Sequence, residues 1–395
     1  MSEIGTMPGK RNESGTRSSA APGWRRVVLG AAGLVLLALF LAYADASFTS
    51  YRLQLVSLVA INAVVAIALT VTSGYTGVFS LGQIGFFGIG AYVGALLTIA
   101  PKWKAPRVLP GLPEWLAGFD TTSWPPQLAL LLACLAAGVV AAAVAVVVGL
   151  PLMRLSGHYV AVATLGFLII VNAVLINWAS VTRGARGLNQ IPSHTTTWVA
   201  FAWVIVAIYA ALRLRSSPYG RAMLAQRENL LAARGIGISI LPTRLLAFVF
   251  GAFFTGAAGA LLAHQIGAVA PTLFSFTTTF TVVIMVVLGG LGSVSGAVVG
   301  AAIMTLAPEF LREVEGGFTI GAIQVGAHHG LAQIILAVGF ILVMIFRPTG
   351  LFGDRELGVA FLSRRPPNFD AQGADESLTP IVDAGVDAVP EDTRN

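Results

Sequence analysis

Residues 73–92 read SGYTGVFSLGQIGFFGIGAY, a stretch with six glycines that joins two strongly apolar runs, 53–72 and 81–99. Each run is about 20 residues long, the length at which a helix crosses a ~30 Å hydrocarbon core. Glycine at this density interrupts a helix, and an interruption at membrane depth is tolerated only where the freed backbone groups face protein or a water-filled cavity. The stretch therefore predicts a membrane-embedded helical protein with a broken helix.

The same glycines admit two interpretations. Gly85, Gly88 and Gly90 fit a small-residue face on which membrane helices approach closely. The corner at 80–83, with Ser80 and Gln83, instead favours a place on a solute pathway, because broken helices commonly line such sites in transporters.

Composition supports a membrane protein. The 395 residues are 56% hydrophobic and only 11% charged, whereas a soluble domain carries roughly 25% charged residues. The net charge of +6 lies in tails and loops without interleaved aromatic residues, so membrane topology explains it better than nucleic-acid binding does. The single cysteine, Cys134, excludes a disulfide within the chain.

Ten apolar segments predict the fold class, an all-α transmembrane bundle of about ten spans. They cover 27–44, 53–72, 81–99, 128–150, 159–178, 198–212, 245–264, 276–288, 294–306 and 331–346. The stretch 276–306 is either two thin spans or one re-entrant hairpin, and neither choice changes the parity of the remaining spans.

Basic residues predict the orientation, since loops rich in arginine and lysine stay in the cytoplasm. Three basic clusters fall on one side: Lys10, Arg11, Arg17, Arg25 and Arg26; Arg213, Arg215, Arg221, Arg227, Arg234 and Arg244; and Arg347, Arg355, Arg364 and Arg365. The connectors near Arg154 and Gly292 join that side. The opposite side is expected to hold an acidic loop with Glu309, Glu313 and Glu315, although Lys102, Lys104 and Arg107 count against the scheme. Both termini are therefore predicted to be cytoplasmic.

The predicted spans and orientation divide the chain into three regions. Residues 1–25 form a polar cytoplasmic tail, 26–350 form the transmembrane domain with a cytoplasmic loop at 213–244, and 351–395 form a mostly disordered acidic tail to which no role is assigned.

Catalytic and energy-converting motifs are missing from the sequence. None of the three lysines lies in a phosphate-binding loop, and neither H-E-x-x-H nor G-x-S-x-G occurs. The histidines lack metal-ligand spacing, so we expect no metal and no cofactor. No carboxylate lies deep within a predicted span, as proton-coupled carriers usually require. Uphill transport by this chain would need energy from a partner.

The arginine-rich loop predicts a short amphiphilic helix. Ser217 is a good N-cap, Pro218 suits the first helical position, and helix-forming residues continue to Ala233 before Gly235 and Gly237 end the helix. Such a helix either docks on a partner protein or only fixes topology by contacting anionic lipid.

Several motifs, taken in order, resemble the membrane permeases of branched-chain amino acid ABC importers. Besides SGYTGVFSLGQIGFFGIGAY they include NWASVTRGARGLNQIP, SPYGRAMLAQRENLLAARGIGI, VVLGGLGSVSGAVVGA and FRPTGLFG. The resemblance covers roughly 53–353. Two features depart from it: many relatives have histidine at the position of Gln83, and the loop at 102–126 has no match.

The resemblance implies a chain that is not an enzyme and binds no ATP. It implies pairing with a second homologous permease, two ATP-binding subunits and an extracytoplasmic solute-binding protein, all at a bacterial inner membrane. It places the contact with the ATPase at Glu228 and Gly237, flanked by Arg221, Arg227 and Gly235.

Polar side chains within the spans are the candidate pathway residues. We assign this role to Asn62, Ser80, Gln83 and Asn172, with helix–helix bridging as the alternative. The resulting prediction is inward transport of branched-chain or related hydrophobic amino acids by alternating access. A urea or amide permease, or a self-sufficient secondary transporter or channel, remains the alternative. Neither the exact solute nor the identity of the paired permease follows from the sequence.

Overall fold

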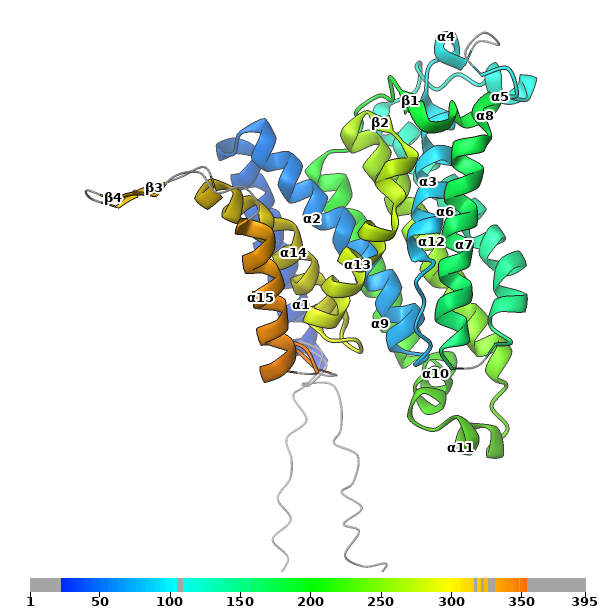
Figure 1. Cartoon of the computed structure of the whole chain (residues 1–395), viewed down its shortest axis with the longest axis vertical. Coiled ribbons are helices and arrows are strands. Elements are labelled where there is room, and N and C mark those ends of the chain that lie inside the picture. Colours follow the sequence, from blue (N-terminus) through cyan, green and yellow to red (C-terminus); the bar gives the residue numbers. More distant parts are fainter. Residues whose placement is uncertain are drawn as a thin grey trace, which may run out of the picture. The chain divides into compact units, whose positions relative to one another are not determined.

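The computed structural model describes residues 23–104, 109–155, 157–315, 318–320, 323–325, 331–347 and 349–353. Most of both predicted tails, with the acidic stretch after 353, lies outside the described residues. Helices dominate the described part, and each of the ten predicted apolar segments is helical. The chain is thus all-α, apart from two pairs of very short strands (Figure 1).

The helices have these bounds: α1 Gly23–Ser47, α2 Ser50–Leu69, α3 Gln83–Thr98, α4 Pro101–Lys104, α5 Glu114–Ala117, α6 Pro126–Leu152, α7 Tyr159–Asn177, α8 Ala179–Thr182, α9 Thr197–Ser216, α10 Pro218–Glu228, α11 Leu230–Gly235, α12 Ile240–Ile266, α13 Phe276–Gly289, α14 Val294–Glu315 and α15 Leu331–Phe346. A π-helical turn, Thr70–Gly74, follows α2, and 3₁₀ turns occur at Gly184–Arg186 and Pro271–Phe274. Strands β1 Leu188–Asn189 and β2 Ala268–Val269 pair antiparallel, as do β3 Phe318–Ile320 and β4 Ile323–Val325.

Six of these helices are long and apolar enough to cross a membrane: α2 with its π-helical turn, α6, α7, α9, α12 and α14. Four shorter apolar helices accompany them in α1, α3, α13 and α15. The 14 residues of α13 reach only about 21 Å, less than a hydrocarbon core. The connector between α13 and α14 lies at the same end of the bundle as α10 (Figure 1).

One boundary was predicted wrongly. The segment expected at 294–306 continues as α14 to Glu315, through Pro308. Glu309, Glu313 and Glu315 therefore lie on the last turns of a helix and not in a loop. Glu309 pairs with Arg312 three residues on, at 2.8 Å. The i, i+3 spacing of this pair is typical of a helix surface. The hydropathy of the segment did not predict that the helix continues beyond residue 306.

Helices α2 and α12 form the centre of the bundle. The apolar windows of α2 and α12 are 78% and 72% buried, whereas those of α6, α7, α9 and α14 are 28–33% buried. Many large apolar side chains on these outer helices, such as Val147, Ile169 and Val206, remain exposed. Apolar surface of this extent suits a lipid or protein environment and not water.

Small residues let α3 approach α12. A Cβ atom on Gly90 would clash with the backbone of Gly256, and one on Gly259 would clash with the carbonyl of Phe87. Gly94 meets Ala260 in the same way. Without a hydrophobic driving force between helices in lipid, such backbone proximity is the main source of packing energy.

The helices alternate in direction, so the bundle has two ends (Figure 1). One, the α4 end, holds α4, α5, α8 and the β1–β2 pair. At this end the N–H of Gly111 donates to the carbonyl of Ser180, and Lys104 Nζ donates to the carbonyl of Phe119 at 3.0 Å. Burial lowers the pKa of Lys104 to about 8. The other, the α10 end, holds α10, α11 and the α13–α14 connector.

We predict that Gly90→Ala destabilises the protein by about 1–3 kcal/mol, because the added methyl group meets the Gly256 backbone. The matched control is Gly166→Ala on α7, where a Cβ meets nothing within 4 Å. This control should be neutral or stabilising, since alanine favours a helix over glycine. Thermal unfolding in detergent measures both; equal melting temperatures for the two variants would contradict the close α3–α12 contact.

Candidate functional site

The broken helix predicted from the glycines is present. After α2 ends at Leu69, the chain makes the π-helical turn Thr70–Gly74 and runs irregularly to Gly82 before α3 begins at Gln83. Side-chain hydroxyls supply much of the hydrogen bonding that the lost helical pattern leaves open. The N–H of Ser80 donates to Ser73 Oγ at 3.1 Å, and the N–H of Leu81 donates to Thr164 Oγ1 of α7 at 3.0 Å.

The corner at 80–83 holds two buried oxygens without a partner. Gln83 Nε2 donates to Thr255 Oγ1 on α12 at 2.7 Å. Within the described chain, Gln83 Oε1 and Ser80 Oγ form no hydrogen bond, and both residues are at most 2% exposed. A buried acceptor without a donor costs about 1–3 kcal/mol, so this corner offers ready hydrogen-bonding capacity for a solute or water.

The glycines after the corner have a packing role. A Cβ atom on Gly85 would lie 3.0 Å from the ring of Phe167, and one on Gly88 would lie 3.1 Å from the ring of Phe274, both tighter than ordinary van der Waals contact. Their contacts agree with a helix-packing face.

The other two candidate pathway residues bridge structural elements. Asn62 Nδ2 donates to Thr305 Oγ1 of α14 at 2.9 Å. Asn172 Nδ2 donates to the carbonyls of Pro271 and Phe274 at 3.0 and 3.1 Å, which ties α7 to the 3₁₀ turn before α13. Of the four candidates, the structure thus brings only Ser80 and Gln83 together.

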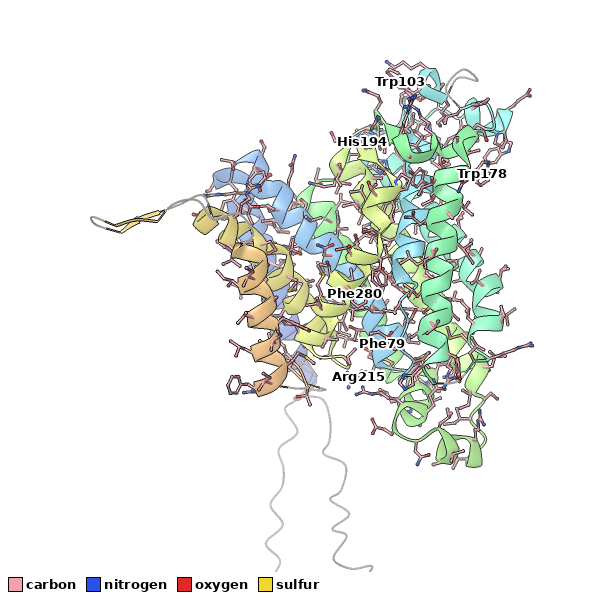
Figure 2. All side chains as sticks on the ribbon, viewed as in Figure 1. Phe79, Trp103, Trp178, His194, Arg215 and Phe280 are labelled. Atoms are coloured by element: carbon pink, nitrogen blue, oxygen red, sulfur yellow. The ribbon has the colours of Figure 1, made fainter. Side chains whose placement is uncertain are left out.

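At the α10 end, two arginines connect the arginine-rich loop to the broken helix and the α13–α14 connector. Arg227 Nη1 donates to the carbonyl of Gly74 at 3.0 Å, and Arg215 Nη1 donates to the carbonyl of Gly292 at 2.9 Å. The guanidinium of Arg215 lies 5.6 Å from the ring centre of Tyr75, a cation–π contact. Figure 2 shows Arg215 at this end of the bundle.

Glycine makes this contact possible at residue 77. Gly77 has φ +70°, and a Cβ there would lie 3.2 Å from Cγ of Arg227. Both the backbone conformation and the close approach favour glycine.

The closing motif FRPTGLFG contacts the same region. The N–H groups of Leu351 and Phe352 donate to the carbonyls of Leu288 and Gly289, at 2.9 and 3.1 Å. Four motifs that are far apart in the sequence therefore meet at the α10 end: the start of 73–92, the arginine-rich loop, the connector after α13 and the closing motif.

The arginine-rich loop contains two helices and not the single helix predicted. Asn229 has an extended backbone (φ −151°, ψ 109°), and its side chain accepts from the N–H groups of Leu231 and Ala232 at 3.0 Å. It therefore ends α10 and caps α11, a function that good helix propensity around it conceals. Gly237 (φ +83°) then ends α11: its N–H donates to Arg234 and that of Ile238 to Ala233, the Schellman pattern.

The predicted coupling residues differ in their surroundings. Glu228, Gly235 and Gly237 are exposed on and around α11. Arg221 is exposed and donates to the carbonyl of Ser216 at 2.8 Å. Arg227 is tied inward to Gly74, as described above.

Two apolar side chains beside them stand out. Leu231 on α11 and Ile236 directly after α11 are each 76% exposed, and apolar side chains that are exposed close together can mark a contact surface for another protein.

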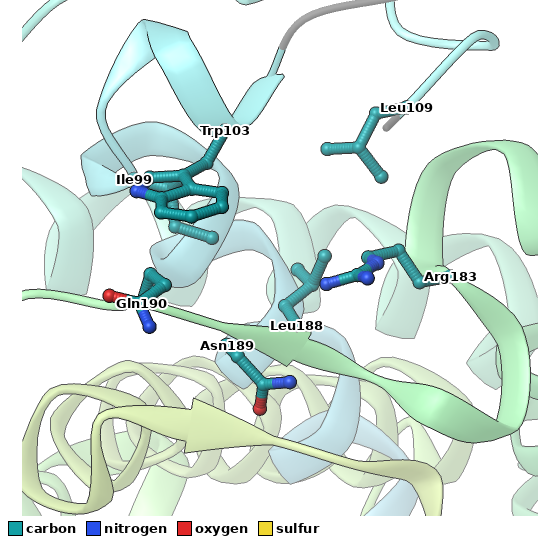
Figure 3. A pocket seen from close by; sticks show the side chains of 7 residues that line it. All are labelled: Ile99, Trp103, Leu109, Arg183, Leu188, Asn189 and Gln190. Atoms are coloured by element: carbon teal, nitrogen blue, oxygen red, sulfur yellow. The ribbon is translucent and has the colours of Figure 1, made fainter. Parts of the chain in front are cut away.

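A pocket of about 220 Å³ lies at the α4 end (Figure 3). Its wall combines the ring of Trp103 with aliphatic side chains, and the guanidinium of Arg183 points into it. Arg183 (φ 61°) and Gln190 (φ 64°) both adopt left-handed backbone conformations, which cost non-glycine residues about 1 kcal/mol or more. Both belong to the motif NWASVTRGARGLNQIP.

Several of these residues were missed at the sequence level. Thr255, Asn229 and Arg215 act through partners that are distant in sequence or through local backbone geometry, and nothing in their spacing reveals this. Among the described residues, no cluster of three or more potential metal ligands occurs.

An apolar helical bundle with a hydroxyl-lined helix break, tied by arginines to a protruding helix pair, is the structure of a membrane-embedded transport subunit. Comparison with known proteins gives the family. The family model described as "Branched-chain amino acid transport system / permease component" matches residues 51–346, and the chain belongs to this family.

Individual relatives agree. The LivM permease protein of the high-affinity branched-chain amino acid transport system of Escherichia coli K12 is 30% identical over 333 residues, 75% of this chain and 69% of LivM. LivM of Salmonella typhimurium is 30% identical over 73% of this chain and 67% of its own length. E. coli LivH, a second permease of that system by name, is 27% identical over 46% of this chain and 61% of LivH. No solved structure matches.

This chain is therefore a permease component and a multi-pass membrane protein, and ATP hydrolysis belongs to a separate subunit. The predicted family and the prediction that the chain is not an enzyme are confirmed.

We predict that Asn229→Ala loosens α11, since the two backbone donors of its first turn lose their acceptor at a cost of about 1 kcal/mol. Hydrogen exchange of residues 230–236 should speed up about fivefold, with little change in α12. Ser216→Ala, which removes an exposed hydroxyl donating to Arg213, is the control. Unchanged exchange in Asn229→Ala would show that α11 does not depend on this cap.

Proposed function

We propose that this chain, as the permease component of a branched-chain amino acid ABC importer, moves hydrophobic amino acids inward by alternating access. About ten spans cross the membrane, and the α10 end faces the cytoplasm. Separate ATP-binding subunits dock on α10 and α11. The observation that carries this proposal is the α10 end itself, where α10 is tied to the helix break through Arg227 and the adjoining α11 exposes Leu231.

Charge supports the orientation. The α10 end carries Arg213, Arg215, Arg221, Arg227 and Arg234, whereas Glu309 lies near the far end of α14. Such an excess of arginine marks the cytoplasmic side. Ten crossings, an even number, would bring both termini to that same side.

Short connections support the coupling. Arg227 donates a hydrogen bond that joins α10 to Gly74, and Arg215 donates one that joins the end of α9 to Gly292. A displacement of α10 and α11 on an ATPase would therefore reach the π-helical turn and the α13–α14 connector directly. Glu228, Gly235, Gly237 and Arg221 remain the proposed contact residues, with Leu231 and Ile236 as apolar anchors; Arg227 acts from inside.

Ser80 and Gln83 are the proposed pathway residues. Their unpartnered oxygens lie buried in the break, where a solute ammonium group would find acceptors. For Asn62 and Asn172, the hydrogen bonds within the protein support a bridging role, and a pathway role would require breaking them.

The remaining partners are assigned to the other surfaces. A solute-binding protein would dock at the α4 end, beside the pocket of Trp103 and Arg183. A second homologous permease would cover part of the apolar outer face.

We predict that Leu231→Ser reduces ATPase recruitment at least about tenfold and abolishes ATP-dependent uptake of leucine in proteoliposomes. The side chain is 76% exposed, so the permease itself should keep its melting temperature. The control is Trp115→Ser, a 72% exposed residue on α5 at the opposite end. Normal recruitment and uptake in Leu231→Ser would exclude α11 as the docking helix. ATP-independent accumulation by the chain alone would favour a secondary transporter.

Labelling of introduced cysteines tests the orientation. Cys134 is the only cysteine and is fully buried, so a membrane-impermeant maleimide should not label the parent protein. In intact cells, we expect labelling of Trp115→Cys from outside and of Leu231→Cys only after the membrane is opened. The reverse pattern would invert the topology.

A further inference from the structure

A cavity of about 500 Å³ at the α10 end has no assigned role. Its walls come from the irregular segment 76–79, the start of α7, the helices α10 and α11, and the first turns of α12. Phe79, labelled in Figure 2, is on one wall. The cavity thus lies between the helix break and the helix pair that joins it.

Two buried polar side chains of this cavity, Gln226 and Arg244, have atoms without a hydrogen-bond partner among the described residues. Gln226 is 3% exposed, and neither its amide nitrogen nor its amide oxygen forms a hydrogen bond within the described chain. Arg244 is 9% exposed; Nη1 donates to the carbonyl of Leu155 at 3.3 Å, but Nε has no partner there. Each unsatisfied buried group destabilises the empty protein, so a bound molecule that satisfies them would repay this cost.

The charge of the lining is one-sided. Arg227 and Arg244 contribute guanidinium groups, and no carboxylate is among the described residues that line the cavity. Val78, Phe79 and Leu230 form an apolar wall. A ligand that fits carries an anionic group and an apolar part.

The amide of Gln226 narrows the chemical class of the ligand further. It presents two N–H donors and one acceptor oxygen. A zwitterionic amino acid offers a carboxylate to accept and an ammonium group to donate, and so pairs with both ends of the amide. The phosphodiester of a lipid accepts hydrogen bonds but carries no donor for the amide oxygen, and free phosphate has no apolar part to contact Val78, Phe79 and Leu230.

We propose that this cavity binds a free amino acid with an apolar side chain, reached from the cytoplasm. Its carboxylate would accept from the guanidinium groups of Arg244 and Arg227 and from the amide nitrogen of Gln226, and its ammonium group would donate to the amide oxygen of Gln226. The proposal rests on the proposed function for the cytoplasmic position and the class of solute. A bound amino acid would bridge segment 76–79 and α10. It would thereby hold the helix pair against the break, so cytoplasmic solute would slow the next transport cycle.

The test uses the full complex with its ATP-binding subunits and partner permease in nanodiscs, without the binding protein. Leucine binding is measured by calorimetry, beside leucinamide, which lacks the carboxylate, 4-methylpentanoate, which lacks the ammonium group, and glycerol phosphate. We expect leucine to bind at least about tenfold more tightly than the three analogues, since each lacks one set of charge-assisted hydrogen bonds.

Gln226→Leu is the decisive variant. It removes both unsatisfied amide atoms, so we expect a higher melting temperature together with at least about tenfold weaker leucine binding. Gln226→Glu, which places a carboxylate beside the arginines, should also prevent leucine binding. It replaces Gln226→Leu in the test if Gln226→Leu does not fold. The control is Gln265→Leu at the opposite end of α12, where an unpartnered buried oxygen is also removed; leucine binding should be unchanged.

Equal leucine affinity in wild type and Gln226→Leu would overturn the proposal, as would tighter binding of glycerol phosphate than of leucine. Absence of leucine binding together with normal ATP-driven uptake would also overturn the proposal. The cavity would then hold only water, and the proposed function would still stand. Absence of uptake itself, in wild type supplied with its binding protein, is the separate outcome that refutes the proposed function.

Discussion

Backbone hydrogen bonding at membrane depth is the constraint on which this structure depends. A helix can be interrupted in an apolar environment only if the protein itself supplies partners for the freed groups. Here Ser73 and Thr164 accept from the backbone N–H groups of Ser80 and Leu81. Beside these bonds, Ser80 and Gln83 each keep a buried side-chain oxygen that has no partner among the described residues.

Close packing of small residues holds the break in position. Gly90 and Gly94 of α3 meet Gly256 and Ala260 of α12 at backbone distance, which leaves no room for side chains and fixes the height of one helix against the other. Because α3 starts only after the break, this contact also fixes where the corner with Gln83 lies relative to Thr255. Packing and site geometry thus depend on the same residues.

The arginines of the loop between α9 and α12 have two physical roles. Their positive charge orients the protein in the membrane, and the number of arginines in the loop is sufficient to predict this orientation. In addition, Arg227 donates to the backbone carbonyl of Gly74, and Arg215 donates to that of Gly292. The resemblance to known permeases placed Arg227 beside an ATPase contact, whereas its guanidinium reaches into the protein. Leu231 and Ile236, in contrast, are each 76% exposed.

The sequence by itself determined the class of protein, the ten apolar helices, the break near 73–82 and the family, because hydropathy, glycine density and motif order are local properties of the chain. Only the tertiary structure decided that Asn62 and Asn172 bridge elements, that Asn229 divides the loop into two helices, and that Gln226 is buried beside Arg244 without a partner. The reason is physical: whether a polar group is satisfied depends on atoms that are distant in sequence, and no periodicity along the chain records which atoms the fold brings to it.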